Sequence, residues 1–159
     1  VFMATAYEGF PVFEEAQHDE KFWELAADLA TSTKEAIEPK RADKVVGGSL
    51  DAVVHVLPKA QPGDAEFDAV RNMLGEFGDE LRFLLIVSDA EVHDSEPAEL
   101  PADRYETERW TIWIAPSGDE KCVRCWHKRP DVGSDPEHPE ICGRCVENVT
   151  GAGETRRVA

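Results

Sequence analysis

The sequence predicts an α+β fold, with two or three helices on a small mixed sheet, followed by a short module that carries all four cysteines. Three observations lead to this prediction. Two stretches have apolar residues at helical spacing, several short apolar runs between turn signals suit strands, and two C-x-x-C pairs stand near the end of the chain. The Pro-Ser-Gly-Asp stretch at 116–119 divides the chain into a body, residues 1–118, and a cysteine module with its tail, residues 119–159.

The first helix is expected to begin after Asp19, whose carboxylate can accept a hydrogen bond from a first-turn amide. Pro39 is expected to end it, because proline lacks an amide hydrogen and clashes with the preceding turn. Between them one helix face recurs at i, i+3, i+4 and i+7, formed by Phe22, Leu25, Ala26, Leu29, Thr33 and Ile37.

A second helix is expected to have Asp64 as its cap and to stop at Gly78. Its apolar positions keep helical spacing at Phe67, Val70, Leu74 and Phe77.

Four segments are predicted to be strands. Residues 49–57 and 109–115 are short runs rich in valine, isoleucine and tryptophan. Residues 81–87 form a continuous apolar run, which is typical of a central strand covered on both faces. Residues 90–93 are expected to add a further strand, and the polar, proline-bearing stretch 94–104 is expected to be a loop.

The charge of the chain is strongly asymmetric. The net charge is −16, and residues 1–119 account for it, with 10 Lys+Arg against 26 Asp+Glu, whereas residues 120–159 carry seven of each. Phosphate binding usually leaves a basic footprint, which the body lacks. An anionic partner would have to meet the cysteine module, where the basic residues are Lys121, Arg124, Lys128, Arg129, Arg144, Arg156 and Arg157.

No membrane or secretion signal is visible. No apolar run approaches the roughly 20 residues that a membrane helix needs. The first residues lack a basic start and an apolar stretch, so they do not resemble a signal peptide. We therefore expect a cytoplasmic protein without a membrane partner, and the start at Val1 suggests a piece of a longer chain.

The cysteines form two knuckles, Cys122 with Cys125 and Cys142 with Cys145, separated by 16 residues. This spacing falls within the C-x2-C, x15–20, C-x2-C pattern of a four-thiolate zinc site, so the module is predicted to be a zinc ribbon. Four sulfurs close the tetrahedron that structural zinc prefers, so one structural Zn²⁺ is expected. Two disulfides or free thiols are the alternatives, and disulfides suit small secreted chains.

No catalytic constellation is present. The sequence has no glycine-rich phosphate loop, no G-x-S-x-G and no H-E-x-x-H. The five histidines are scattered, and His55, in a predicted strand, is interpreted as an ordinary, partly buried side chain.

Arg124 and Trp126 are the strongest candidates for binding. Both lie in or beside the first knuckle, where a metal would hold the backbone rigid. An exposed indole beside cations offers an unpaired RNA base a stacking face and its phosphate a counter-charge. The alternative is that Trp126 packs against the protein itself, as we expect for Trp110 and Trp113 in their apolar strand.

Several motifs resemble the C-terminal region of bacterial isoleucyl-tRNA synthetases. In the module they are C-V-R-C-W at 122–126, D-V-G at 131–133, E-I-C-G-R-C at 140–145 and the ending G-E-T-R-R-V-A at 153–159. Upstream, VFMATAYEGFP at 1–11, SLDAVVHVLP at 49–58 and LRFLLIVSDAEV at 81–92 resemble segments of the same family, less specifically.

This resemblance implies a region of an ATP-dependent isoleucine–tRNA ligase that helps to hold the anticodon loop of tRNA(Ile). It implies that Arg124 and Trp126 contact anticodon bases, and Lys128, Arg129 and Arg144 complete the candidate tRNA-binding set. The family's HIGH and KMSKS catalytic signatures do not occur here, so no catalytic residue is assigned. The alternatives are the zinc-ribbon end of a DNA glycosylase and a zinc ribbon that binds protein.

Overall fold

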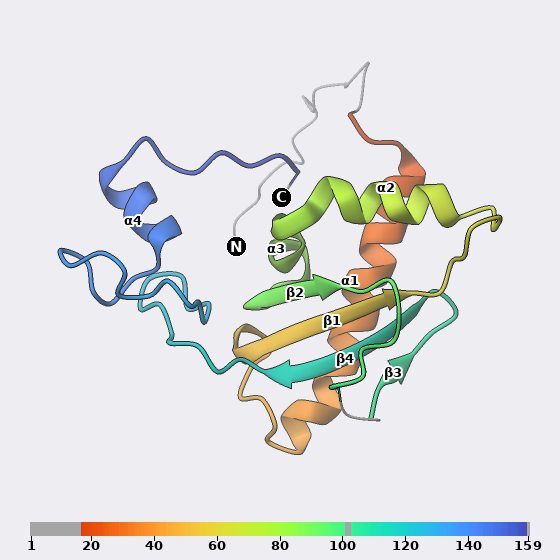
Figure 1. Ribbon diagram of the computed structural model, residues 1–159, viewed down its shortest axis with the longest axis horizontal. Helices are drawn as coiled ribbons and strands as arrows, with labels where there is room; N and C mark the ends of the chain where they lie inside the picture. The colour runs from red at the N-terminus through yellow and green to blue at the C-terminus, as the bar shows by residue number, and fades with distance from the viewer. Residues whose placement is uncertain (1–16, 101–102, 159) are drawn as a thin grey trace, which may run out of the picture.

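The computed structural model describes residues 17–100 and 103–158. The stretch at 1–11 that carries part of the resemblance lies outside the described residues. The α+β prediction is confirmed by the elements that Figure 1 shows in chain order: α1 (Glu20–Ala42), β1 (Ala52–Pro58), α2 (Phe67–Phe77), α3 (Leu81–Leu85), β2 (Asp89–Val92), β3 (Tyr105–Glu106), β4 (Trp110–Pro116) and α4 (Gly143–Thr150).

Four strands form one mixed sheet in the order β2-β1-β4-β3. β1 runs parallel to β2 and antiparallel to β4, and the two-residue β3 pairs antiparallel with β4. β1, β2 and β4 confirm the strands predicted at 49–57, 90–93 and 109–115. β1 and β4 therefore lie at the centre of the sheet, and β2 is an edge strand.

α1 begins as predicted and ends later than predicted. The Asp19 carboxylate accepts a hydrogen bond from the Phe22 amide at 2.8 Å, which confirms the cap. The helix nevertheless continues through Pro39 to Ala42. Because Pro39 stands in the last turn, the helix loses little there, and the Pro39 carbonyl still accepts a hydrogen bond from Asp43 at 3.0 Å.

α2 confirms the second predicted helix, but its cap was predicted wrongly. The helix starts at Phe67, after Glu66. The Asp64 carboxylate instead accepts a hydrogen bond from the Gln61 amide at 2.7 Å, so it closes the preceding turn. An aspartate before an apolar run can close a turn or cap a helix, and the sequence does not distinguish these roles.

The strand predicted at 81–87 is wrong, because this run begins with the short helix α3. Leu81 and Leu85, four residues apart, are both buried, as on one helix face. Gly78, with φ +47°, lets the chain turn out of α2, and Ile86 ends α3 in the left-handed conformation. A short continuous apolar run has no period that separates strand from helix, so packing decided its conformation.

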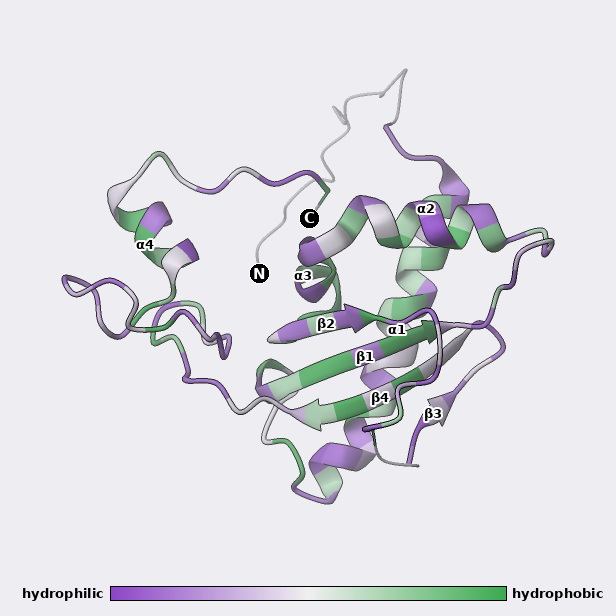
Figure 2. Ribbon diagram, viewed as in Figure 1, coloured by the Kyte–Doolittle hydropathy of each residue, from purple (hydrophilic) through white to green (hydrophobic). Residues whose placement is uncertain are grey.

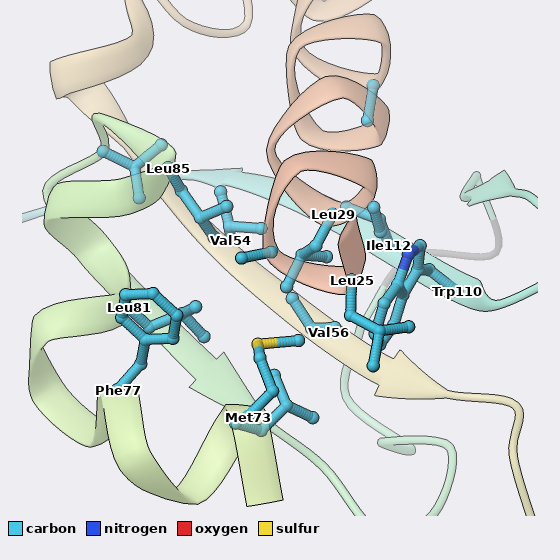
Figure 3. Packing of buried hydrophobic residues seen from close by; sticks show 14 of the residues in the cluster. Leu25, Leu29, Val54, Val56, Met73, Phe77, Leu81, Leu85, Trp110 and Ile112 are labelled. Atoms are coloured by element: carbon cyan, nitrogen blue, oxygen red, sulfur yellow. The ribbon is translucent and has the colours of Figure 1, made fainter. Parts of the chain in front are cut away.

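The main core lies between the helices and one face of the sheet. Figure 3 shows Leu25 and Leu29 of α1 pointing toward Val54 and Val56 of β1, with side chains of α2 and α3 beside them. Trp110 of β4 is fully buried in this core, as predicted. Its indole N–H donates to the Asp28 carboxylate at 2.7 Å, so its polar group is satisfied. This core joins the helices α1, α2 and α3 to one face of the sheet.

The opposite face of β1 and β4 carries a mixture of side chains. Residues of β1 alternate between buried and partly buried, as in a strand with one core face. Trp113 is buried, as predicted, although its strand position faces away from Val54 and Val56. The polar segment after β2 runs in front of β1 and β4 on its way to β3 (Figure 1). The outer face is therefore not a plain solvated surface.

Figure 2 shows apolar residues along β1 and β4 and mixed colours on the helices, as expected for amphipathic elements over one core. Among the described residues, no helix is both long and apolar enough to cross a bilayer. The cysteine module has its own small buried cluster, which includes Cys122, Cys142 and Cys145 and is separate from the main core. The boundary at 118/119 stays a prediction.

Candidate metal centre and nucleic-acid interface

The first knuckle is a tight hairpin turn. Lys121 and Lys128 form an isolated antiparallel bridge, and within it the Cys122 amide donates to the His127 carbonyl at 2.9 Å. The Trp126 amide donates to the Cys122 carbonyl, also at 2.9 Å, and Trp126 adopts φ +68°. The left-handed conformation closes the turn and fixes the direction in which the indole leaves the backbone.

The second knuckle is the beginning of α4, a helix that the sequence analysis did not predict. Cys142 is its N-cap and Cys145 lies in its first turn. The Gly143 amide donates to the Asp131 carboxylate at 2.9 Å, and a Cβ at Gly143 would stand 2.9 Å from that same oxygen. A side chain at this position would displace the Asp131 carboxylate, which ties the intervening loop to the second knuckle.

The four cysteine side chains converge. All four sulfurs lie within 4.8 Å of one another, and those of Cys125 and Cys142 are 3.8 Å apart. Zn–S bonds of about 2.3 Å in a tetrahedron would separate the sulfurs by roughly 3.8 Å. All four cysteines are free, and this separation is far longer than the ~2.0 Å of a disulfide, so the two-disulfide alternative is wrong. The residues present fit one Zn²⁺ ion.

The protein environment shifts the pKa values of the cysteine thiols in opposite directions. Burial raises the pKa of the Cys142 thiol to about 12 and also raises the pKa of Cys145. At Cys122 burial also opposes ionisation, but backbone amides, including those of Cys125 and Cys142, lower its pKa to about 6. Four adjacent thiolates would repel one another, so the cluster needs a cation to ionise completely.

Two arginines lie against the sulfur cluster. Arg124 Nη1 donates to the Cys145 sulfur at 3.6 Å. Burial opposes the charge on Arg144, but a hydrogen bond to Cys125 and the nearby Glu154 carboxylate raise its pKa. Four thiolates around one Zn²⁺ carry a net charge of about −2. The two guanidinium groups would compensate this charge, so their position beside the cysteines suits a bound metal.

Trp126 is exposed, so the alternative that it packs inside the protein is wrong. Its side chain is 61% exposed, the highest value among the exposed large apolar residues of the described chain. Arg124 is also exposed, although one of its nitrogens contacts Cys145. A guanidinium has five N–H donors, so several remain for a ligand.

Lys128 and Arg129 lie at the junction between module and body. The Lys128 amide donates to the Ser88 hydroxyl at 2.6 Å, and its ammonium group donates to the Ser117 carbonyl at 3.1 Å. Arg129 donates to the Ser88 carbonyl at 3.3 Å and pairs with Asp89 at 3.4 Å. Both side chains are partly buried. These residues hold the module in place, in contrast to Arg124 and Trp126.

Arg144 and the tail also contact the body. The guanidinium groups of Arg144 and Arg156 lie over the Phe83 ring, 4.9 and 4.2 Å from its centroid. The amides of Arg157 and Val158 donate to the Glu80 carboxylate at 2.7 and 2.8 Å. In Figure 1 the tail returns from α4 toward α2 and α3. Arg144, Arg156 and Arg157 therefore contact the body, as Lys128 and Arg129 do, whereas Arg124 contacts the sulfur cluster.

Sequence reasoning missed the body residues of this junction. Phe83 was assigned to a central strand, and Ser88 was not singled out, although it accepts from the module and donates to the Leu50 carbonyl at 2.5 Å. Neither residue belongs to a motif with its own chemistry. Their role depends on which loop folds back onto them, which a linear pattern does not contain.

The cysteine module matches a known class. The family described as "Zinc finger found in FPG and IleRS" matches residues 119–148, a range that contains all four cysteines. A zinc finger therefore occupies this end of the chain, and the zinc expected from the cysteine spacing is supported by both its sequence and its geometry.

Comparison over the full length extends the match to the body. The chain is 38% identical to the isoleucine–tRNA ligase of Halorhodospira halophila and 42% identical to that of Azotobacter vinelandii, in each case over 100% of the chain and 16% of the relative. It is 41% identical to the isoleucine–tRNA ligase of Pseudomonas putida over 96% of the chain and 16% of the relative. The chain is thus homologous to a region of isoleucine–tRNA ligases, which confirms the resemblance, and it spans about 16% of the length of these relatives.

Proposed function

We propose that this chain is the part of an isoleucine–tRNA ligase that binds the anticodon loop of tRNA(Ile). In this proposal Cys122, Cys125, Cys142 and Cys145 hold one structural Zn²⁺. The ion supplies no reaction and acts as a cross-link that fixes the two knuckles relative to each other. The complete enzyme would join isoleucine to its tRNA with ATP in the cytoplasm, and this region would contribute recognition only.

The observation that carries the proposal is the exposed indole on a rigid turn. Trp126 leaves a backbone that is held by two hydrogen bonds and, with zinc bound, by the cross-linked cysteines on either side. A large apolar side chain presented to water at a fixed angle is costly for the isolated protein and useful to a binding surface. Unpaired anticodon bases have flat faces that an indole can stack against.

Arg124 extends the same surface. It lies between the two cysteines of the first knuckle, and its contact with the Cys145 sulfur restricts its position. Its remaining N–H groups can donate to a base edge or to a phosphate. The body carries the net negative charge, so RNA would meet the module through this limited surface. Lys128, Arg129 and Arg144 would act mainly by keeping the module docked.

Two other functions are less well supported. The zinc finger alone is described for FPG as well as IleRS, so it does not exclude the end of a DNA glycosylase. The matches to isoleucine–tRNA ligases, however, include the acidic body. A protein partner for Trp126 is the remaining alternative, and it would leave tRNA kinetics unchanged when Trp126 is replaced.

The test is Trp126→Ala in a full-length ligase that carries this region. Stacking on one base is worth ~1–3 kcal/mol, so KM for tRNA in aminoacylation should rise roughly 5- to 150-fold. Isoleucine activation, measured without tRNA by pyrophosphate exchange, should not change, because the substitution lies outside the catalytic signatures. Trp126→Phe should recover part of the loss, since it keeps an aromatic face.

Val123→Ala is the matched control. Val123 is 57% exposed on the same knuckle but has no flat ring. Its replacement should leave KM for tRNA unchanged, with the zinc content of all variants at the wild-type value. If Trp126→Ala charges tRNA with wild-type kinetics, the proposed role of the indole is wrong.

A further inference from the structure

Three potential metal ligands meet on the outer face of the sheet, away from the cysteine module. His55 lies in the middle of β1, and its partner across the parallel ladder is Glu91 of β2. His93 follows two residues after Glu91, so its side chain lies on the same side of the chain. The His93 amide donates to the Val56 carbonyl at 2.8 Å, which continues the ladder beyond β2.

The ligand atoms are spaced as around one ion. His55 Nδ1 lies 3.1 Å from His93 Nε2 and 3.2 Å from Glu91 Oε2, and His93 Nε2 lies 3.9 Å from the same oxygen. Zn–N and Zn–O bonds of about 2.0–2.2 Å in a tetrahedron separate neighbouring ligand atoms by roughly 3.3–3.6 Å. Three ligands at these distances leave one position open for water.

The surroundings suit a bound cation. The His55 side chain is 12% exposed, His93 is 24% exposed and Glu91 is 52% exposed, so the histidines are sheltered while the carboxylate remains accessible to an entering ion. On the other side of β1, the residue of β4 that pairs with His55 is the buried Trp113, which supplies an apolar wall. Ladder hydrogen bonds on both strands fix the backbone, so the ligands are already positioned before an ion arrives.

The charges near the site favour a cation. The Glu91 carboxylate lies directly beside the two imidazoles and supplies a negative charge that compensates part of the charge of a divalent cation. Asp89, two residues before Glu91 and therefore on the same face of β2, adds a further negative charge. It also pairs with Arg129 at 3.4 Å. Without a metal, the two imidazoles would share one proton between Nδ1 and Nε2.

We propose that His55, Glu91 and His93 form a second metal site, which binds Zn²⁺ or a chemically similar divalent transition metal. Two imidazoles and one carboxylate are a ligand set typical of such ions and unsuited to Mg²⁺ or Ca²⁺. Because Glu91 lies in the edge strand β2, His93 directly follows that strand and His55 lies in the central strand β1, the bound ion clamps the edge of the sheet. β2 in turn leads from Ser88 and Asp89, which hold the cysteine module.

The experiment measures zinc stoichiometry in the whole chain, with inorganic Zn²⁺ as the probe. After the chain is reloaded and dialysed against micromolar zinc, wild type should hold two ions, and Glu91→Gln and His93→Gln should hold one. Loss of an outer-shell partner of a metal costs about 10–100-fold in affinity, so the loss of a direct ligand should weaken the second ion at least tenfold. The cysteine-bound ion is the internal reference, because neither substitution touches it.

Imidazole ¹⁵N NMR provides the second readout. Zinc should shift Nδ1 of His55 and Nε2 of His93, the two nitrogens that face each other, and leave the other ring nitrogens as N–H donors. The control is Glu99→Gln, which removes an exposed carboxylate elsewhere in the segment after β2 and should keep two ions.

The proposal is overturned if wild type binds a single ion under these conditions. It is equally overturned if a second ion binds but Glu91→Gln and His93→Gln retain it, since that ion would then lie elsewhere. Unchanged His55 and His93 ¹⁵N shifts at two equivalents of zinc would show that the imidazoles form only a hydrogen bond.

Discussion

At the scale of single residues, Ser88 connects the two parts of the chain. It is fully buried, and its amide donates to the Ala52 carbonyl at 3.0 Å. Its hydroxyl donates to the Leu50 carbonyl and accepts from the Lys128 amide. Both hydroxyl functions are used inside the protein, and one of them satisfies the backbone of the module.

Replacing Ser88 with alanine should destabilise this junction. The Lys128 amide would lose its acceptor in a partly buried site, and an unsatisfied group of this kind costs ~1–3 kcal/mol. The free energy of unfolding, measured by urea titration, should fall by about that amount. Hydrogen exchange at Lys128 should quicken more than exchange in β1.

Ser95→Ala is the control for Ser88→Ala, because Ser95 is exposed. Its replacement should change neither the free energy of unfolding nor the rate of hydrogen exchange at Lys128. If Ser88→Ala unfolds at the wild-type urea concentration, the contact with Lys128 contributes nothing to docking.

At the scale of elements, one charged cluster joins α1, the start of α2 and the start of β4. Arg109 donates to the Glu66 carboxylate at 2.9 and 3.1 Å, and Lys21 donates to it at 2.6 Å. Glu24 and Asp28 of α1 also pair with Arg109, at 3.3 and 3.7 Å. Arg109 with its hydrogen bonds, followed by Lys21, lowers the pKa of Glu66 to about 2.

This cluster should make stability depend on pH in the acid range. The folded pKa of Glu66, about 2, lies below its ordinary value of 4.5, so its contribution is complete above pH ~4.5 and is lost as pH falls toward 2. Glu66→Gln should be less stable than wild type at pH 7, and the difference should shrink between pH 4.5 and pH 2. Thermal melts across this range measure it.

Because Glu66 is about one-third exposed, solvent screens its pairs, and we expect a modest effect. Glu99→Gln, which changes an exposed carboxylate, should track wild type at every pH. A constant difference between Glu66→Gln and wild type from pH 7 to pH 2 would contradict the assignment.

At the scale of the whole molecule, the body and the cysteine module depend on different sources of order. The body has a continuous apolar core beneath its sheet, whereas the buried cluster of the module consists mainly of cysteines. Zinc contributes ~10–16 kcal/mol to the folding of small metal-bound peptides. The module should therefore need zinc, and the body should not.

Removing zinc with a strong chelator should unfold residues 119–150 selectively. About one tightly held ion per chain should be released from the cysteines, and amide protection in α4 and the first knuckle should be lost. The protection of β1 and β4 should remain, because their core contains no metal ligand. Adding Mg²⁺ in place of Zn²⁺ should not restore the module, since thiolates do not suit that ion.

Hydrogen exchange resolved by residue gives the comparison between the two parts. If β1 and β4 lose protection together with α4, the two parts fold as one unit. If α4 keeps its protection after the ion has left, zinc is not the source of its order.

The predictable part of this fold is the part in which local pattern and final environment agree. Asp19 caps α1 because its carboxylate needs only an adjacent amide. The cysteine pairs converge because two-residue spacing aims both sulfurs of a knuckle at one point. Leu81 and Leu85 were assigned wrongly because an apolar run of that length suits either a strand or a helix.

The candidate site, like the fold, could be predicted from the sequence only in part. Cys122, Cys125, Cys142 and Cys145 could be found from spacing alone, and the exposure of Trp126 could only be left open. His55 was taken for an ordinary strand residue, because its neighbours Glu91 and His93 are distant in sequence and meet it only through the β1–β2 register.

The sequence by itself determined the buried faces of α1 and α2, the strands β1 and β4, the zinc finger and the resemblance to isoleucine–tRNA ligases. Each of these depends on residue spacing over a short stretch or on a contiguous motif. The tertiary structure decided which cations of the module are exposed and which are docked on Phe83 and Ser88. It also brought the side chains of His55, Glu91 and His93 together on the sheet. These outcomes depend on which distant segments pack together, and tertiary packing decides this, not any local sequence pattern.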